Sequence, residues 1–458
     1  MSMNQQRRRW LGAMPGVVLL AFAMGAGSVA QAAVDVVPAG PLLSTKAIAY
    51  QFAVYLPEKP PAPPMEALRQ ALKAMAGAPT LTQKLDEPPK NAVVMATLNE
   101  KVATTYAPPD ADQVQRFGRG LSKEQAAALA RSRSALIMDF AHPSAQRMSA
   151  YRSSLLIAEQ VARATGGLLW DEETREVFTP DAWHARRLES WERDVPDVMQ
   201  QIVIHAYRGE RQVRAISLGM GKFGAPDVVI DNFPWSSNAQ MGNLINAMAQ
   251  LSVEGASIGA NGQFDLDFAA LRHPRIRDAL QKQLLPNAKA KAPLLLVKGT
   301  PEEGDPRNRL IEIRFDRASG KDDGARQDAL LGALYGSKDG ISRITHNEAL
   351  EAASQAAKAK LPGLRDAFNK GLAPGAFIMV KAPFATPSGG REWMWVEVSA
   401  WQGDAITGLL KNEPADIPDL HGGQTVKVSQ RDVFDYLLRD ASGRSEGNET
   451  AKIIAKMR

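Results

Sequence analysis

Apolar residues along the chain follow two spacings, and together these predict an α+β fold. Short apolar runs typical of strands occupy residues 46–56, 91–97 and 134–140. Apolar positions three and four residues apart predict helices over 65–76, 121–133 and 148–165. The last helix is expected to stop at Gly166-Gly167. This succession predicts a mixed sheet with packed helices in the N-terminal part.

The same alternation continues to about residue 290. A hairpin is predicted over residues 168–179, around a polar turn at 172–175. Further strands are expected at 201–207, 213–218 and 227–230, and further helices at 239–251 and 275–285. The Ala-, Lys- and Pro-rich residues 286–293 predict a boundary, which ends an N-terminal α+β domain of residues 33–290.

Beyond this boundary we expect a connecting segment and a smaller, strand-rich C-terminal domain. The connecting α/β segment, residues 291–374, has expected strands at 294–298 and 310–315 and expected helices at 328–335 and 346–360. The C-terminal domain, residues 375–458, follows Pro374-Gly375. Its pattern predicts strands at 376–382, 392–398, 405–410 and 425–428, and a helix at 431–439.

Residues 1–32 predict a cleavable signal peptide. Arg7–Arg9 form a basic region, residues 11–26 are apolar and uncharged, and Ala30-Gln31-Ala32 provides a cleavage site. The apolar stretch is short and contains Pro15-Gly16, so we expect no stable membrane span after cleavage. An uncleaved anchor is the alternative, and the arginines leave both the general and the twin-arginine export routes open.

The composition fits a protein that works in the periplasm or is secreted. The chain has no cysteine, which excludes disulfides, lipid-modified cysteine, thiol nucleophiles and cysteine-based metal sites. It has 55 basic and 50 acidic residues, and without the three arginines of the signal peptide 52 basic residues remain. This near balance predicts no nucleic-acid partner.

Two glycine-rich motifs do not fit the chemistry that they resemble. Residues 219–224 read GxGxxG, but a dinucleotide site needs a helix to begin there, and Pro226 and an apolar run follow instead. Residues 255–259 read GxSxG, but a nucleophile elbow needs a strand before the serine, and here a helix is expected. We interpret both as turns or loops and expect no cofactor.

Neither the histidines nor the acidic clusters predict a metal site. The six histidines are all more than five residues apart, at positions 142, 184, 205, 273, 346 and 421. Residues 171–173 and 302–305 are acidic clusters without the regular spacing of a calcium loop, and we interpret them as solvated turns.

The candidate contact residues gather around residues 391–398, REWMWVEV. In a strand, Trp393, Trp395 and Glu397 share one face, and Met394, Val396 and Val398 share the other. Tryptophan is favoured at binding hot spots. The candidate contact surface is therefore Lys381, Trp393, Trp395, Glu397 and Asn412. The alternative is that both tryptophans close the core of a small barrel or sheet.

Several motifs recur in order along the C-terminal domain. They are VKAPF at 380–384, EWMWV at 392–396, GLLKNEP at 408–414, LHGGQTVKV at 420–428, VFDY at 433–436 and EGNET at 446–450. On these motifs residues 377–458 resemble the YegJ-like domains, domain-of-unknown-function family 2314. Gln424 and Tyr436 depart from the Asp and Trp usual in the family. The resemblance implies a fold but no established activity, and it suggests a similarity to domains predicted to be immunity proteins in bacterial toxin systems.

A weaker likeness concerns the N-terminal part. TGGLLWD at 165–171 and LGMGKFG at 218–224 resemble a second uncharacterised family, domain-of-unknown-function family 4261. That resemblance implies that both glycine-rich stretches are structural turns.

These observations favour an exported bacterial protein that acts as a periplasmic protein-binding module of the immunity or adaptor type. A cell-envelope hydrolase with a carboxylate site in the N-terminal domain is the alternative, and paired carboxylates in a deep pocket would support it. A structural envelope protein without a tight ligand is a third reading.

Overall fold

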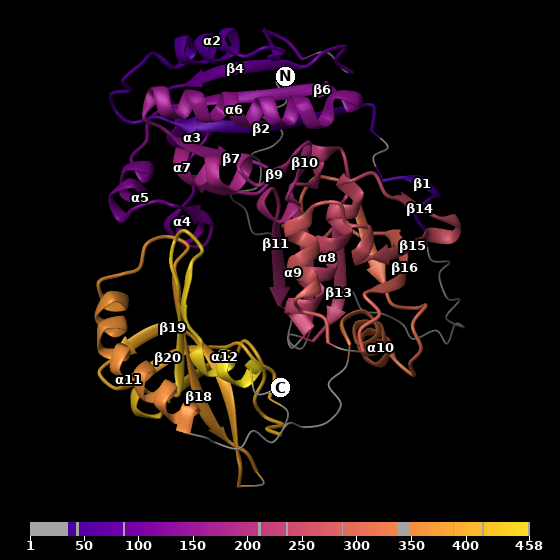
Figure 1. The fold of residues 1–458 in the computed structure, drawn as a ribbon. Helices are drawn as coiled ribbons and strands as arrows, with labels where there is room; N and C mark the ends of the chain where they lie inside the picture. The colour runs from indigo at the N-terminus through magenta and orange to yellow at the C-terminus, as the bar shows by residue number, and fades with distance from the viewer. Residues whose placement is uncertain are drawn as a thin grey trace, which may run out of the picture. The chain divides into compact units, whose positions relative to one another are not determined.

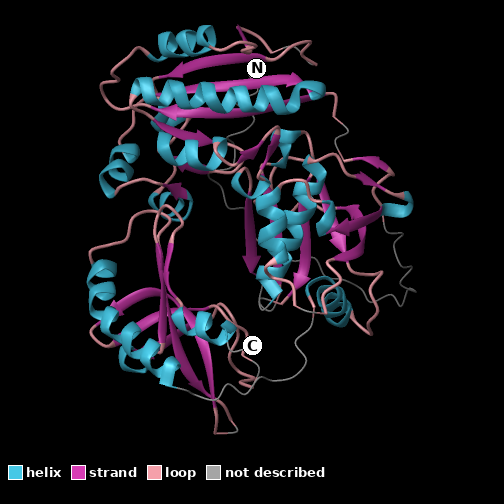
Figure 2. Cartoon of the chain, viewed as in Figure 1, coloured by secondary structure: helices cyan, strands magenta, loops and turns pink. Residues whose placement is uncertain are grey.

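The computed structural model describes residues 35–456, except 43–44, 86–87, 209–211, 235–236, 286, 337–347, 388 and 415. The predicted signal peptide, residues 1–32, lies outside the described residues. The described strands form three sheets of six or seven strands and two short pairs, with helices packed on the sheets (Figure 1, Figure 2). Most neighbouring strands are antiparallel, and the predicted α+β class is confirmed.

The first sheet has seven strands in the order β3-β4-β6-β2-β7-β8-β5. Its strands are β2 (Ala47–Tyr55), β3 (Thr80–Thr82), β4 (Val93–Asn99), β5 (Gly118–Arg119), β6 (Ala135–Pro143), β7 (Leu168–Asp171) and β8 (Glu176–Phe178). Helices α2 (Pro64–Ala74) and α6 (Arg147–Thr165) pack together over one face (Figure 1). Three short helices pack on the opposite face of this sheet: α3 (Val102–Thr105), α4 (Ala111–Phe117) and α5 (Lys123–Ala130).

Strand β2 is apolar on both faces because both faces are covered. Phe52 and Val54 belong to the core under α6, whereas Ala53 and Tyr55 belong to a second core with Val102 of α3. A strand buried on both sides needs a continuous apolar run rather than an alternating one. This explains why residues 46–56 carry so strong a strand signal.

The helix ends follow their local sequence. Helix α5 begins with a capping box, in which the Ser122 side chain accepts the backbone N–H of Gln125 and the Gln125 side chain accepts that of Ser122. Helix α6 ends where Gly166 adopts the left-handed conformation at φ 67°, as predicted. Helix α7 (Pro180–Trp183) continues directly into a π-helical turn, η2 (His184–Leu188).

The second sheet has six strands in the order β11-β12-β13-β17-β16-β15. Its strands are β11 (Val203–Arg208), β12 (Val213–Leu218), β13 (Asp227–Phe233), β15 (Gln263–Asp267), β16 (Lys291–Lys298) and β17 (Leu310–Arg314). Helices α8 (Asn238–Val253), α9 (Pro274–Gln281) and α10 (Asp323–Tyr335) share its core. Two strand pairs, β1 (Gly40–Pro41) with β14 (Ser257–Ile258) and β9 (Trp191–Glu192) with β10 (Val195–Pro196), complete this part of the chain.

Strands from both sides of residue 290 belong to this second sheet. Strand β16 pairs with β15 and β17, and β17 pairs in parallel with β13. The apolar residues of β16 and β17 are buried in the same core as those of β13 and α8. The boundary predicted at 290 therefore does not separate two sheets, because each side needs the other to bury its apolar face.

The glycine-rich residues 219–224 form the turn between β12 and β13, as the sequence predicts. Met220–Phe223 make one 3₁₀ turn, η4, flanked by Gly219 at φ 111° and Gly224 at φ 72°. A Cβ atom on Gly224 would lie 2.7 Å from the Thr45 side chain, so both conformation and space require glycine there.

The C-terminal sheet has the order β21-β20-β19-β18-β22-β23. Its strands are β18 (Phe377–Ala385), β19 (Arg391–Gln402), β20 (Ala405–Leu410), β21 (Thr425–Ser429), β22 (Asp435–Arg439) and β23 (Ser445–Gly447). The helix predicted over 431–439 is wrong: a 3₁₀ turn, η8 (Gln430–Asp432), leads into β22, which pairs with β18. Pairing with a strand more than fifty residues earlier outweighs the local pattern. Helix α12 (Glu449–Lys456) follows and was not predicted.

Helix α11 (Glu348–Asn369) belongs to the C-terminal domain rather than to the connecting segment. Its residues Ala357, Leu361 and Leu364 are buried in one core with β18 and β19. The helix continues through Pro362 to Asn369, beyond the end at residue 360 that the sequence predicts. Pro362 and Lys358 are exposed, so the carbonyl group that loses its helical partner can bind water instead. The domain thus begins near residue 348 and not at 375.

Candidate functional site

Strand β19 presents different residues on its two faces. Met394, Val396 and Val398 are buried in the core with α11, whereas Trp393 and Trp395 are partly exposed on the opposite face. The core of the domain is filled without these two tryptophans. We call the surface formed by Lys381, Trp393, Trp395, Glu397 and Leu409 the aromatic face.

Lys381, on β18, lies beside the central residue of the aromatic face, Trp395. It is paired in register with Trp395, and its Nζ lies 5.8 Å from the centroid of that ring, within the range of a cation–π contact. Burial lowers the pKa of Lys381, and the charge of Asp435 opposes this shift. The Asp435 carboxylate accepts hydrogen bonds from Thr450 N and Oγ1. Within the part of the chain that the structure describes, the Lys381 ammonium forms no hydrogen bond or ion pair.

The other predicted residues surround this pair. Lys411 Nζ lies 2.9 Å from Glu397 Oε2, and the Asn412 Oδ1 atom accepts the backbone N–H of Trp395 at 2.6 Å. Asn412 thus holds the strand and does not extend the surface. The structure brings all five predicted residues together around Trp395.

Sequence reasoning missed two residues of this region. Leu409 of β20 pairs with Glu397 and is 41% exposed. Phe434 lies beside Trp393, with ring centroids 4.6 Å apart. The alternation of β20 could have revealed Leu409, but nothing local places Phe434 beside β19.

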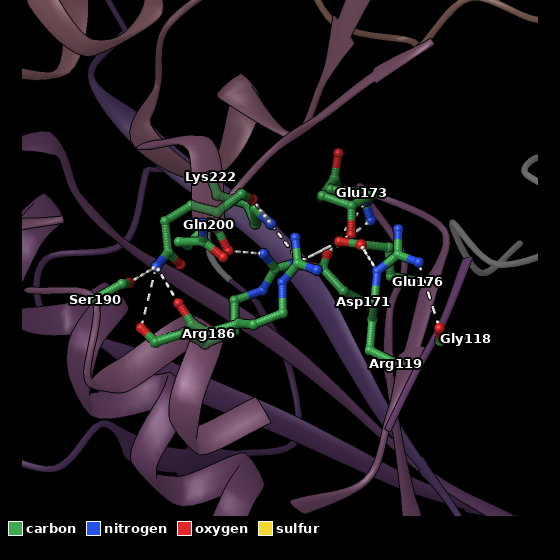
Figure 3. Close-up of polar contacts among 12 residues, drawn as sticks. Gly118, Arg119, Asp171, Glu173, Glu176, Arg186, Ser190, Gln200 and Lys222 are labelled. Atoms are coloured by element: carbon green, nitrogen blue, oxygen red, sulfur yellow. Dashed lines mark hydrogen bonds and ion pairs between the residues drawn. The ribbon is translucent and has the colours of Figure 1, made fainter. Parts of the chain in front are cut away.

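A second group of polar residues forms a buried ion cluster in the N-terminal part (Figure 3). Asp171 of β7, Glu176 of β8, Arg187 of η2 and Lys222 of η4 all have side chains that are 0% exposed. Arg187 Nη2 donates to Asp171 Oδ2 at 2.9 Å and to Glu176 Oε2 at 2.8 Å. Lys222 Nζ donates to Asp171 Oδ2 at 2.5 Å and to the Gln201 carbonyl at 2.8 Å.

The cluster is charged because its members stabilise one another. Burial by itself would raise the pKa of Glu176, but Arg187 and Arg119 lower it to about 2. Burial lowers the pKa of Lys222, and Asp171 opposes that shift. A charge buried away from water is tolerated only beside partners of opposite charge. If one partner is removed, the desolvation free energy of the remaining charges is no longer compensated.

The buried ion cluster corrects our interpretation of residues 171–173 as a solvated turn. Asp171 is inaccessible, and Glu172 Oε2 accepts hydrogen bonds from Trp170 Nε1 at 2.8 Å and Tyr106 Oη at 3.0 Å. The cationic partners lie far along the chain, where sequence could not place them. The one available signal was Lys222, a single lysine between the apolar residues Met220 and Phe223.

The acidic residues 302–305 are only partly solvated. Glu302 and Glu303 are exposed, but the Asp305 side chain is 2% exposed and pairs with Arg214 Nη2 at 2.6 Å. Arg214 Nη1 also binds Asp231 at 2.6 Å. This acidic turn is therefore fastened to the second sheet.

The burial of Asp171 and Glu176 is relevant to the alternative function, a hydrolase with a carboxylate site in the N-terminal domain. Asp171 and Glu176 are closed to solvent and each binds an arginine, so neither can exchange a proton with a substrate. Among the described residues, no group of three or more His, Asp or Glu side chains is arranged to hold a metal ion. His346 lies outside the described residues.

His205 provides a pH-dependent contribution to stability. Burial and the charge of Arg175 lower its pKa to about 4, against the opposing charge of Glu176. Between pH 6.5 and 4 the unfolded chain therefore binds a proton that the folded chain does not, and stability falls as the pH falls. We expect a loss of up to about 3 kcal/mol over this window.

Urea unfolding at pH 7.5 and pH 4.5 measures this contribution. The variant His205→Phe, which keeps a ring stacked on Phe117, should lose less stability between the two pH values than the unchanged protein. Equal losses in both proteins would show that His205 does not titrate in this way.

No helix in the described part of the chain combines the length and the apolar character needed to cross a membrane.

Comparison with known proteins identifies the C-terminal domain. The model of a family described as uncharacterized proteins conserved in bacteria, domain-of-unknown-function family 2314, matches residues 347–457. The resemblance predicted for this region is confirmed, and the match begins beside α11, in agreement with the packing of that helix. The likeness of the N-terminal part to family 4261 stays a prediction. No curated protein and no solved structure matches the chain.

Proposed function

We propose that this chain is an exported bacterial protein-binding module, of the immunity or adaptor type, whose aromatic face binds a partner protein in the periplasm. One observation carries the proposal: two tryptophans and a lysine are partly exposed on one sheet face, and none of the three belongs to the hydrophobic core of the domain. Retaining such residues outside the core is costly unless they make contacts elsewhere.

The chemistry of the aromatic face indicates what kind of surface it would bind. Trp393, Trp395 and Leu409 offer flat apolar area, and Lys381 offers a half-buried positive charge among them. A complementary partner would present an apolar patch around an aspartate or glutamate. The partner carboxylate would form an ion pair with the Lys381 ammonium.

Export is the second part of the proposal, and its support comes from the sequence. Residues 7–32 combine a basic region, an uncharged apolar stretch and a small-residue cleavage site. The absence of cysteine agrees with a protein that folds outside the cytoplasm without disulfides.

The test is cross-linked capture of a tagged full-length chain from a bacterial host that carries its gene. We expect one stoichiometric partner, and we expect Trp393→Ala with Trp395→Ala to reduce its recovery at least tenfold, since both residues would sit at the centre of the contact. Mass spectrometry identifies the partner, and circular dichroism shows that the variant remains folded.

Two controls separate binding from other effects. Leu98→Ala removes a partly exposed apolar residue from the first sheet and should leave recovery unchanged. Deletion of residues 2–32 should abolish recovery, because the chain would stay in the cytoplasm. Equal recovery with the double tryptophan variant would show that the aromatic face is not the binding surface.

A further inference from the structure

The loop between β16 and β17, residues 299–309, lies on the face of the second sheet that is turned away from α8. At its start, a Cβ atom on Gly299 would be 2.7 Å from Leu310 Cβ of β17. Farther along, Tyr207 Oη of β11 donates to the Gly304 carbonyl at 3.3 Å. The loop therefore passes from β17 over β13 and β12 to the edge strand β11, and we call it the strap.

A small apolar cluster lies beneath the strap. Ile216 of β12, Val229 of β13 and Leu310 of β17 form this cluster, which is separate from the core shared with α8. Ile216 and Val229 are 0% exposed, and a Cβ atom on Gly299 would be 3.1 Å from Val229 Cγ1. The strap has the sequence GTPEEGDPRNR, without valine, leucine, isoleucine, methionine or an aromatic residue. It thus covers apolar side chains but is held to the sheet by polar contacts.

Arg214 of β12 fastens the middle of the strap. Its Nη2 donates to Asp305 Oδ2 at 2.6 Å and to the Thr300 carbonyl at 2.9 Å. Its Nη1 donates to Asp231, on the neighbouring β13, at 2.6 Å. Within the described part of the chain, Arg214 Nε and Asp305 Oδ1 are buried without a hydrogen-bond partner. The strap therefore leaves polar atoms unsatisfied on both sides of this contact.

Lifting the strap would leave neither of these charges buried and unpaired. Arg214 would keep the Asp231 carboxylate, and Asp305 would be hydrated. The large cost of separating a buried ion pair comes from an uncompensated charge, and here it is mostly avoided. The remaining cost is the exposure of the apolar cluster. A segment from another molecule, with its own carboxylate and an apolar side chain, would cover the cluster better than the strap does.

We propose that this face of β11, β12 and β13 is a second binding surface, for an extended acidic segment of a partner protein, and that the strap occupies it until the partner binds. The contacts of the strap define the chemistry required: a carboxylate for Arg214, and backbone carbonyls for Arg214 and the Tyr207 hydroxyl. An aspartate or glutamate next to a large apolar residue would meet these needs. The surface is separate from the aromatic face and does not depend on the function proposed for it.

Thiol labelling of the full chain measures whether the strap opens. The protein has no cysteine, so Val229→Cys introduces a single thiol under the strap. Val228→Cys is the matched control, because Val228 is equally buried but lies in the core shared with α8. We expect a maleimide to react with the thiol at 229 at least tenfold faster than with the thiol at 228, because local opening needs less free energy than global unfolding.

Two substitutions in the strap test the contact with Arg214. Asp305→Asn should raise the labelling rate at 229 at least tenfold, because it removes the charge that fastens the strap, and should leave the rate at 228 unchanged. Glu303→Gln, at an exposed acid of the same strap, should change neither rate.

A synthetic peptide with the sequence of residues 299–309 probes the surface itself. By fluorescence anisotropy we expect saturable binding to the Asp305→Asn chain, with a Kd at least tenfold lower than for the unchanged protein, whose own strap competes. The same peptide with asparagine in place of its aspartate should bind at least tenfold more weakly, because it offers Arg214 no carboxylate.

Other results would contradict the proposal. Equal labelling at 228 and 229 would mean that the strap opens only when the protein unfolds, and this comparison needs no change in the strap. Faster labelling at both positions with Asp305→Asn would indicate general destabilisation, and no saturable peptide binding would show that this face binds no such segment. If Asp305→Asn prevents folding, the peptide should slow labelling in the Val229→Cys chain by occupying the open face, and an unchanged rate would contradict the binding surface.

Discussion

Asp171→Asn should lower the free energy of unfolding by about 3–5 kcal/mol, the usual cost of breaking a buried ion pair from one side. The substitution keeps the shape of the side chain but removes the carboxylate that Arg187 and Lys222 share. Lys222 would then be a buried ammonium hydrogen-bonded to neutral groups such as the Gln201 carbonyl, without its carboxylate. Chemical unfolding followed by circular dichroism measures the loss.

A second substitution shows whether charge is the cause. Lys222→Met removes the cation that Asp171→Asn leaves without its carboxylate. The double variant should therefore be about 1–3 kcal/mol more stable than the sum of the two single losses predicts. Asp181→Asn is the matched control, because Asp181 also pairs with an arginine but is 89% exposed, and it should have little effect. Strict additivity of the two cluster variants would contradict the interaction.

Trp183→Ala should cost about 3–5 kcal/mol, the range for truncating a large aromatic residue in a core. Trp183 is fully buried and stands edge-on to Phe52 at 5.1 Å and to Phe178 at 5.3 Å between ring centroids. Its Nε1 donates to the Leu155 carbonyl at 3.0 Å, so α7 and α6 lose a hydrogen bond as well as packing. The loss in the free energy of unfolding is measured as a shift of the denaturant midpoint, provided that the variant keeps the m-value of the unchanged protein.

Two variants calibrate this prediction. Trp183→Phe should cost clearly less, because it keeps most of the ring volume and loses mainly the hydrogen bond. Trp393→Ala, at a partly exposed tryptophan of the aromatic face, should also be milder. A loss in Trp183→Ala no larger than in Trp393→Ala would mean that the core around Phe52 collapses to fill the space.

Sequence periodicity predicted the elements whose burial is decided locally. Helix α6 has apolar residues at helical spacing and a glycine at its end, so its stop at Gly166 could be predicted. Strand β19 has a regular alternation of residues, so its two faces could be told apart. The GxGxxG stretch was correctly assigned to a turn because its neighbours are strands.

The failures share one cause, which is pairing over long distances. Strand β22 has a helix-like local sequence but is fixed by β18, and α11 passes Pro362 because its apolar stripe meets the C-terminal sheet. The buried ion cluster joins residues 171, 176, 187 and 222, and no local pattern indicates that Asp171 and Glu176 are fully buried while Glu172 and Glu173 are partly exposed.

The early start of the C-terminal domain has a consequence for the evolution of such chains. Recombination that moved only residues 375 onward into another gene would deliver a sheet whose core face, with Ile378, Val380 and Val396, lacks the helix that covers it. Such a product would aggregate rather than acquire a new partner. The heritable module is therefore helix and sheet together, and we expect fusions in other bacterial genes to join upstream of residue 348.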